Sequence, residues 1–229
     1  MRKCILHSTV AIITGSASIA GYAANSASLS ITGSIEPVTC DVTLSAPSID
    51  FGTIPASTLA LRNNALAGSD VTVDVECGGP ATIAIQTKDN RSASAMTVAE
   101  VKDEFGTQSA AFSDPMFFGL GVDSANKKVG ALMLGLTAAS VDGTTNANIL
   151  VGTDKLAWTK KTASTSSALY LDKDAYFASA ANASASQPME FTKAAYTISS
   201  GIYLRNASKY PAGEIVKIDG SVTFSVVYL

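Results

Sequence analysis

The chain closes with Gly220-Ser221-Val222-Thr223-Phe224-Ser225-Val226-Val227-Tyr228-Leu229, a stretch in which apolar and polar side chains alternate. One face carries Val222, Phe224, Val226 and Tyr228. Such a period of two is typical of a β-strand that buries one face. A long apolar strand at an open edge is an aggregation hazard unless another strand pairs with it. Two interpretations therefore stay open: the last strand of a complete sandwich, or an edge strand that receives a partner by β-augmentation.

The remaining chain predicts further strands. Residues 27–35 alternate, with Leu29, Ile31, Gly33 and Ile35 on one face, which predicts a half-buried strand that ends before Pro37. Residues 71–77 alternate too, and residues 78–80, Gly-Gly-Pro, indicate a turn into a hairpin partner at residues 83–88. A short helix is expected at residues 98–102, and loop-rich insertions are expected around residues 92–187. Many short strands between turn signals favour an all-β sandwich or barrel.

Composition excludes several classes of protein. The 229 residues are 47% hydrophobic and only 15% charged, with a formal net charge of −3. So few charges argue against a charge-rich disordered chain, and an acidic chain lacks the basic surface of a nucleic-acid-binding protein. Ala, Ser and Thr together supply 86 residues, which suits an extracellular β protein.

The first 23 residues have the layout of a secretory signal peptide. Arg2 and Lys3 precede an apolar stretch of small residues, and Gly21-Tyr22-Ala23 offers a cleavage site. A transmembrane anchor is the alternative, but Ser, Thr and Gly interrupt the stretch. We therefore expect export of residues 24–229 as one domain, with no transmembrane segment.

Loss of that segment would remove Cys4 and His7, the only histidine, and would leave Cys40 and Cys77. Without histidine, a Ser-His-Asp or Cys-His site cannot form, and a zinc site of the Cys/His type lacks ligands. No catalytic residue, metal site or cofactor is expected. In an oxidising compartment the two cysteines favour one disulfide, worth about 4 kcal/mol in the chain-entropy model, over two free thiols.

Three pieces of the sequence resemble subunits of bacterial chaperone–usher fimbriae (pili). The first is residues 31–40, Ile-Thr-Gly-Ser-Ile-Glu-Pro-Val-Thr-Cys, which is similar to the first strand of that family. The second is Cys77 after an alternating strand, and the third is the C-terminus with Gly220, Phe224 and Tyr228. Residues 89–91, 118–121 and 128–130 also resemble a fimbrial-like group of secreted proteins that carries a domain of unknown function.

The resemblance implies an immunoglobulin-like, pilin-type β-sandwich that lacks its last strand. A periplasmic chaperone would lend a strand, and at the outer-membrane usher the N-terminal extension of another fimbrial subunit would replace it. The expected groove lies beside the C-terminal strand, with Gly220, Val222, Phe224, Val226 and Tyr228. Leu29, Ile31, Gly33 and Ile35 belong either to a donor strand or to the first strand. The resemblance thus implies a route through the periplasm to a fimbrium on the cell surface.

A different function stays open beside this one. A stand-alone secreted or surface binding module, for example a glycan-binding adhesin, would also have this composition. Its candidate sugar-stacking residues are Trp158, Tyr170, Tyr176 and Tyr203. An enzyme is not expected, because nothing in the pattern marks a pair of catalytic carboxylates.

Overall fold

The computed structural model describes residues 27–106 and 112–229. The predicted signal peptide, residues 1–23, lies outside these residues. The chain divides into two compact units, Met1–Glu36 and Pro37–Leu229, and each is described by itself. In the first unit, residues 27–36 have neither helix nor strand, and Leu29, Ile31 and Ile35 are 86%, 89% and 101% exposed. The half-buried strand predicted for residues 27–35, Gly33 included, is therefore not found here.

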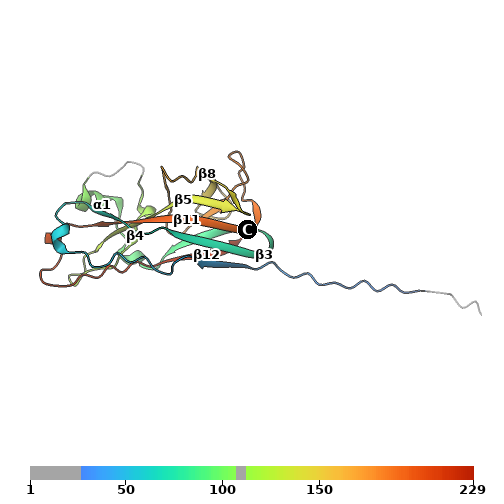
Figure 1. Cartoon of the computed structure of the whole chain (residues 1–229), viewed down its shortest axis with the longest axis horizontal. Coiled ribbons are helices and arrows are strands. Elements are labelled where there is room, and N and C mark those ends of the chain that lie inside the picture. The colour runs from blue at the N-terminus through green and yellow to red at the C-terminus, as the bar shows by residue number, and fades with distance from the viewer. Residues whose placement is uncertain (1–26, 107–111) are drawn as a thin grey trace, which may run out of the picture. The chain divides into compact units, whose positions relative to one another are not determined.

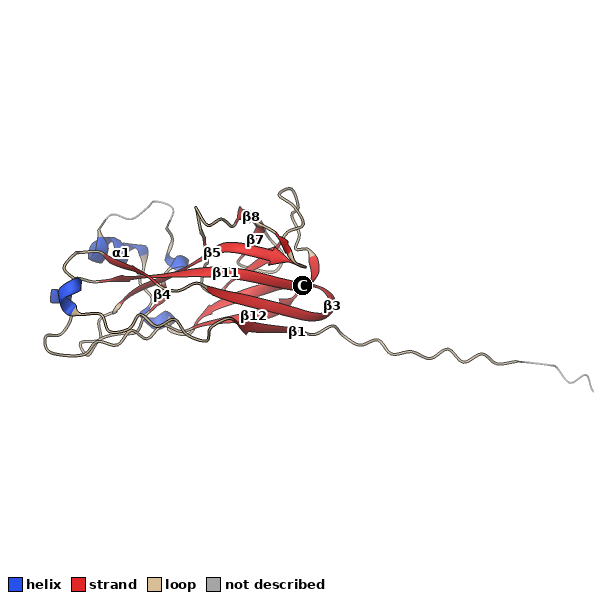
Figure 2. Cartoon of the chain, in the orientation of Figure 1, coloured by secondary structure: helices blue, strands red, loops and turns tan. Residues whose placement is uncertain are grey.

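The regular secondary structure of the second unit is mostly β-strand, joined by loops (Figure 2), which confirms the all-β, sandwich-like fold. Its strands are β1 (Cys40–Leu44), β2 (Asn64–Ala67), β3 (Val71–Asp89), β4 (Phe118–Gly119), β5 (Gly130–Val141), β6 (Thr144–Thr145), β7 (Asn148–Gly152), β8 (Thr159–Thr162), β9 (Leu169–Tyr170), β10 (Ala175–Ser179), β11 (Glu190–Leu204) and β12 (Val222–Tyr228). One α-helix, α1 (Val98–Phe105), and the 3-10 turns η1 (Ala56–Thr58), η2 (Ser92–Ser94), η3 (Asp114–Met116) and η4 (Ala207–Lys209) complete the described elements.

Strand β3 belongs to both sheets. Its first half, at residues 71–77, pairs with β1 and β11 in the first sheet, which continues through β5; Figure 1 shows β3, β11 and β5 side by side. Its second half, at residues 83–89, pairs with β12 and β10 in the second sheet, which continues through β7 and β8. All these pairs are antiparallel. The predicted hairpin turn at residues 78–80 is wrong: the Gly-Gly-Pro stretch lies within one continuous strand that passes from one sheet to the other.

The core lies between the inner faces of the two sheets. Val73, Ile85 and Phe177 are almost completely buried there, and the Phe177 and Tyr196 rings meet edge to face with centroids 5.1 Å apart. The Tyr196 hydroxyl lies 2.9 Å from Ser179 Oγ, and burial raises the pKa of Tyr196 to about 12. A buried phenol with a hydrogen-bond partner fits a packed interior.

Helix α1 covers the outer face of β5 and β11. Thr97 and Glu100 form a capping box at its start, and Val101 and Phe105, one turn apart, are buried. They pack in a second core with Ala131 and Met133 of β5. Because the core and α1 bury β5 on both faces, its sequence reads as a continuous apolar run instead of an alternation.

Residues 92–187, where loop-rich insertions are expected, include the strands from β4 to β10, and β5 and β10 contribute directly to the two sheets. The strand β10 reads Ala-Tyr-Phe-Ala-Ser, and its small residues have weak strand propensity. Burial between β3 and β7 makes it a strand despite that propensity.

Candidate functional site: an open apolar groove

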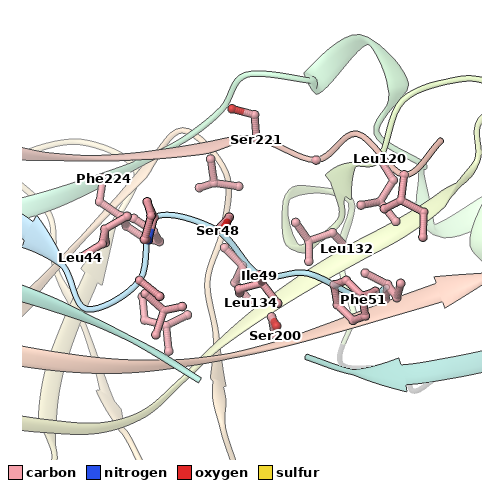
Figure 3. Close-up of a pocket in the computed structure, with 18 of the residues that line it drawn as sticks. Leu44, Ser48, Ile49, Phe51, Leu120, Leu132, Leu134, Ser200, Ser221 and Phe224 are labelled. Atoms are coloured by element: carbon pink, nitrogen blue, oxygen red, sulfur yellow. The ribbon is translucent and has the colours of Figure 1, made fainter. Parts of the chain in front are cut away.

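An apolar groove of about 290 Å³ opens beside the start of β12 (Figure 3). One wall is made by residues 44–51, which follow β1, and the other by residues 218–224, which lead into β12. The floor is the inner face of the first sheet, and Leu120 closes one side. The floor residues are Val71, Val73, Leu132, Leu134, Ile198, Ser200 and Ile202. All of these floor residues are buried, so the groove lies over the same face that elsewhere forms the core between the sheets.

The groove carries no charge among the residues that line it in the described part of the chain. Hydroxyl groups supply its polarity, from Ser48 and Ser221 in the walls and Ser200 in the floor (Figure 3). Leu44 is 40% exposed, and Phe224 is only partly buried, although both point into the groove with the core beneath them. Apolar side chains left half-covered in a concave site mark a binding groove.

The edge of β12 beside the groove is unpaired within residues 27–106 and 112–229. Val222 to Tyr228 pair with β3 along one edge, in register from Val222 opposite Asp89 to Tyr228 opposite Ile83. An edge strand presents alternate N–H and C=O groups that another strand can take up. The groove thus combines an apolar floor with a row of free backbone hydrogen-bonding groups.

The disulfide joins two paired strands of the first sheet, β1 and β3, beyond the groove. Cys40 of β1 and Cys77 of β3 lie directly opposite each other and are bonded, which confirms the predicted pair. The Cys40 N–H donates to the Tyr228 hydroxyl at 2.6 Å, so the end of β12 abuts the start of β1.

The structure brings together only part of the predicted groove. Gly220, Val222 and Phe224 line it. Val226 packs against the core instead, and the Tyr228 side chain, 49% exposed, bonds to the backbone of Cys40. Both residues follow the apolar alternation of β12, but they lie beyond the end of the groove.

Sequence reasoning missed the opposite wall. Residues 44–51 include Leu44, Ile49 and Phe51, yet residues 45–51 form no strand. Ser45 still continues the ladder, because its N–H donates to the Thr72 carbonyl at 2.9 Å. The signal that could have found this wall is the group of apolar residues around Pro47, directly after the first disulfide cysteine.

The four aromatic residues considered for sugar stacking do not gather at one site. Tyr170 meets the Phe112 ring edge to face, and Tyr203 packs near Phe105. Trp158 lies over Gly152, and Tyr176 occupies the position paired with that glycine in β10. Two of the four thus lie near each other on the second sheet, and the other two pack beside α1 and its neighbours.

The described residues contain no group of three or more His, Cys, Asp or Glu side chains that could hold a metal ion. They also contain no helix of the length and apolar character that a membrane span requires.

The fold and groove define a disulfide-bonded all-β protein with an apolar groove beside its C-terminal strand. Residues 29–133 match a family described as a protein of unknown function (DUF1120). This match supports the resemblance to a group that carries a domain of unknown function. The matched residues include the wall at 44–51 and strand β3, whereas β12 lies beyond them. No curated protein matches the chain.

Proposed function

We propose that the chain is a structural subunit of a chaperone–usher fimbrium, assembled by donor-strand complementation of the groove beside β12. The observation that carries the proposal is the uncharged, half-open groove bordered by the unpaired edge of β12. An inserted strand would bury Leu44 and Phe224 and would continue the second sheet past β12. The immunoglobulin-like description, a sandwich that lacks one strand, belongs to this proposal.

The N-terminal segment has the chemistry of the missing strand. Residues 27–36 alternate apolar and small polar side chains, with Glu36 as the one charged residue. Leu29, Ile31 and Ile35 are almost completely exposed within their own unit. Full burial of one such side chain is worth about 1.5–3 kcal/mol. We propose that this segment is the donor strand and that it enters the groove of another subunit.

The partners and the route follow from the same proposal. A periplasmic chaperone would fill the groove first, and exchange at the outer-membrane usher would then place the donor segment of a further subunit there. The signal peptide at residues 1–23 would direct export, and oxidation in the periplasm fits the Cys40–Cys77 disulfide.

A peptide experiment tests the proposal. A synthetic peptide of residues 24–35 is added to the full chain, and thermal unfolding is measured. At a concentration about 100 times Kd, binding adds about 2.7 kcal/mol, or about 5–10 °C in Tm for a domain of this size.

Matched control peptides come from the alternation itself. An Ile31→Asp peptide should lose this effect because it places a charge against the apolar floor. A Ser30→Asp peptide, altered on the opposite face, should retain most of it. Equal effects of the two peptides, or no effect of the native one, would count against donor-strand binding.

Co-expression with a periplasmic fimbrial chaperone gives the second test, with a stable one-to-one complex as the expected result. A chain that remains a stable monomer and binds neither chaperone nor peptide would favour the stand-alone binding module.

A further inference from the structure

Two of the sequence segments that resemble the fimbrial-like group meet in the structure. Residues 89–91 contain the end of β3 and the turn after it, and residues 118–121 contain β4. The buried Asp89 carboxylate accepts from the Gly119 N–H at 2.9 Å and from the Arg91 N–H at 2.8 Å. At Gly119 a side chain would require the backbone to shift, because a Cβ atom would overlap the Arg91 carbonyl oxygen. The turn is therefore fixed against the first sheet.

The same turn holds the β12 wall of the groove. Asn90 Nδ2 donates to Ser221 Oγ at 3.1 Å and to Thr223 Oγ1 at 2.8 Å, and the Asn90 N–H donates to the Ser221 carbonyl at 2.9 Å. The Arg91 guanidinium binds both carboxylate oxygens of Asp219, at 2.9 and 3.0 Å. The adjacent residues Asn90 and Arg91 thus anchor a seven-residue wall segment, residues 217–223, at three of its positions.

Apart from these contacts, the wall is held by the pairing of Val222 and Thr223 with β3 and by the packing of Ile218 and Val222 against the core. Residues 217–221 form no strand, and β12 begins only at Val222. The Asp219 N–H donates to the Leu120 carbonyl at 3.0 Å, which ties the wall to the side of the groove. On the groove side no strand of the described chain pairs with it. A bidentate Arg–carboxylate pair fixes orientation as well as distance, so it can hold such a segment in place.

We infer that Asn90 and Arg91 form a clamp that keeps the β12 wall in its open position before any strand enters the groove. They are positioning residues: neither lines the groove, and both act through Asp219, Ser221 and Thr223. A wall that is already in place lowers the ordering cost of binding, which is the general benefit of preorganisation. The identity of the incoming strand rests on the proposed function, whereas the clamp itself is a property of the free chain.

Hydrogen exchange on the free, full chain tests the clamp without any occupant. Arg91→Gln removes the ion pair, and we expect amide exchange in residues 217–223 to accelerate about tenfold, because local opening becomes easier. Exchange in β5 and β11 should stay unchanged. The matched control is Lys193→Gln, which breaks another exposed ion pair, Lys193 with Glu76 at 2.8 Å, away from the groove. It should leave the wall unaffected.

A double variant distinguishes a local positioning role of Arg91 from a general loss of stability of the chain. The exchanged pair Arg91→Asp with Asp219→Arg should restore slow exchange of the wall. Should Arg91→Gln fail to fold, Arg91→Lys keeps the charge but loses the bidentate geometry, and it should show a smaller local acceleration. Unchanged exchange in the wall, or an acceleration spread evenly over the whole chain, would overturn the clamp.

Peptide binding then connects the clamp to the groove. The 24–35 peptide should bind Arg91→Gln about three- to tenfold more weakly than the native chain, since the wall must be ordered on binding. Failure of the peptide to bind even the native chain would refute the proposed donor strand. The hydrogen-exchange result on the free chain would still show whether Asn90 and Arg91 hold the wall in place. Equal binding to both chains would refute the contribution of the clamp to the groove and leave the proposed function standing.

Discussion

Truncation of Phe224 is expected to cost much less stability than truncation of a phenylalanine in the closed core. Phe224 lies in the wall of the groove and is partly exposed, whereas Phe177 is 1% exposed between the sheets. Removing a buried phenylalanine costs about 3–5 kcal/mol, which includes the cavity that it leaves. At Phe224 the groove is already open, so no new closed cavity forms. The expected loss of stability is then only the free energy of burying the covered part of the ring, about 1–2 kcal/mol.

The assay is chemical denaturation of Phe224→Ala and Phe177→Ala in the full chain with the disulfide intact. The two free energies of unfolding should differ by about 2–3 kcal/mol, with similar m-values because both variants expose nearly the same surface on unfolding. With saturating 24–35 peptide, Phe224→Ala should lose more stability than without it, because the donor strand would bury this ring. An equal loss for the two variants without peptide would show that Phe224 belongs to a closed core and that the groove is not open.

Four further predictions concern the stability of the fold. Replacing Cys40 and Cys77 by alanine should lower the free energy of unfolding by about 4 kcal/mol, measured by urea denaturation against the native chain. Asp123→Ala should cost about 3–5 kcal/mol, because it leaves the buried Arg205 guanidinium, 2.8 Å from the Asp123 carboxylate, without its partner. Burial alone would raise the pKa of Asp123, but hydrogen bonds from backbone N–H groups and from Arg205 outweigh it and lower that pKa. The stabilisation should therefore be present above about pH 4 and be lost as pH falls further, which acid unfolding would reveal. Gly119→Ala should fail to reach native stability in a thermal melt, because the added methyl group overlaps a backbone carbonyl.

The alternation of side chains predicts strands well where one face is buried. β12 and the first half of β3 follow this rule, and both are strands in the structure. The rule says less about strand ends and pairing. Residues 78–80 have the composition of a hairpin turn, yet β1 and β12 support the two sides of that point, and the strand continues into the second sheet.

The groove shows the limit of sequence reasoning more clearly. The apolar face of β12 indicates that something covers it, and Val222 and Phe224 were identified in this way. Val226 and Tyr228 share the pattern but lie past the groove, because the position at which one wall stops depends on the fold. The wall at residues 44–51 has no regular period, so only its place beside Val71 and Val73 reveals its role.

The N-terminal segment explains why a strand-like sequence need not be a strand of its own fold. Leu29, Ile31 and Ile35 alternate as cleanly as the apolar residues of β12, yet they are exposed and residues 27–36 form no strand. A period of two requires an apolar surface and a paired edge, but it does not require that both belong to the same molecule. The groove beside β12 offers that surface and that edge. Under the proposed function, the two unsatisfied features of one chain are the two halves of the contact between successive copies. Such a contact joins different surfaces head to tail, so it does not close on itself and extends into a fibre.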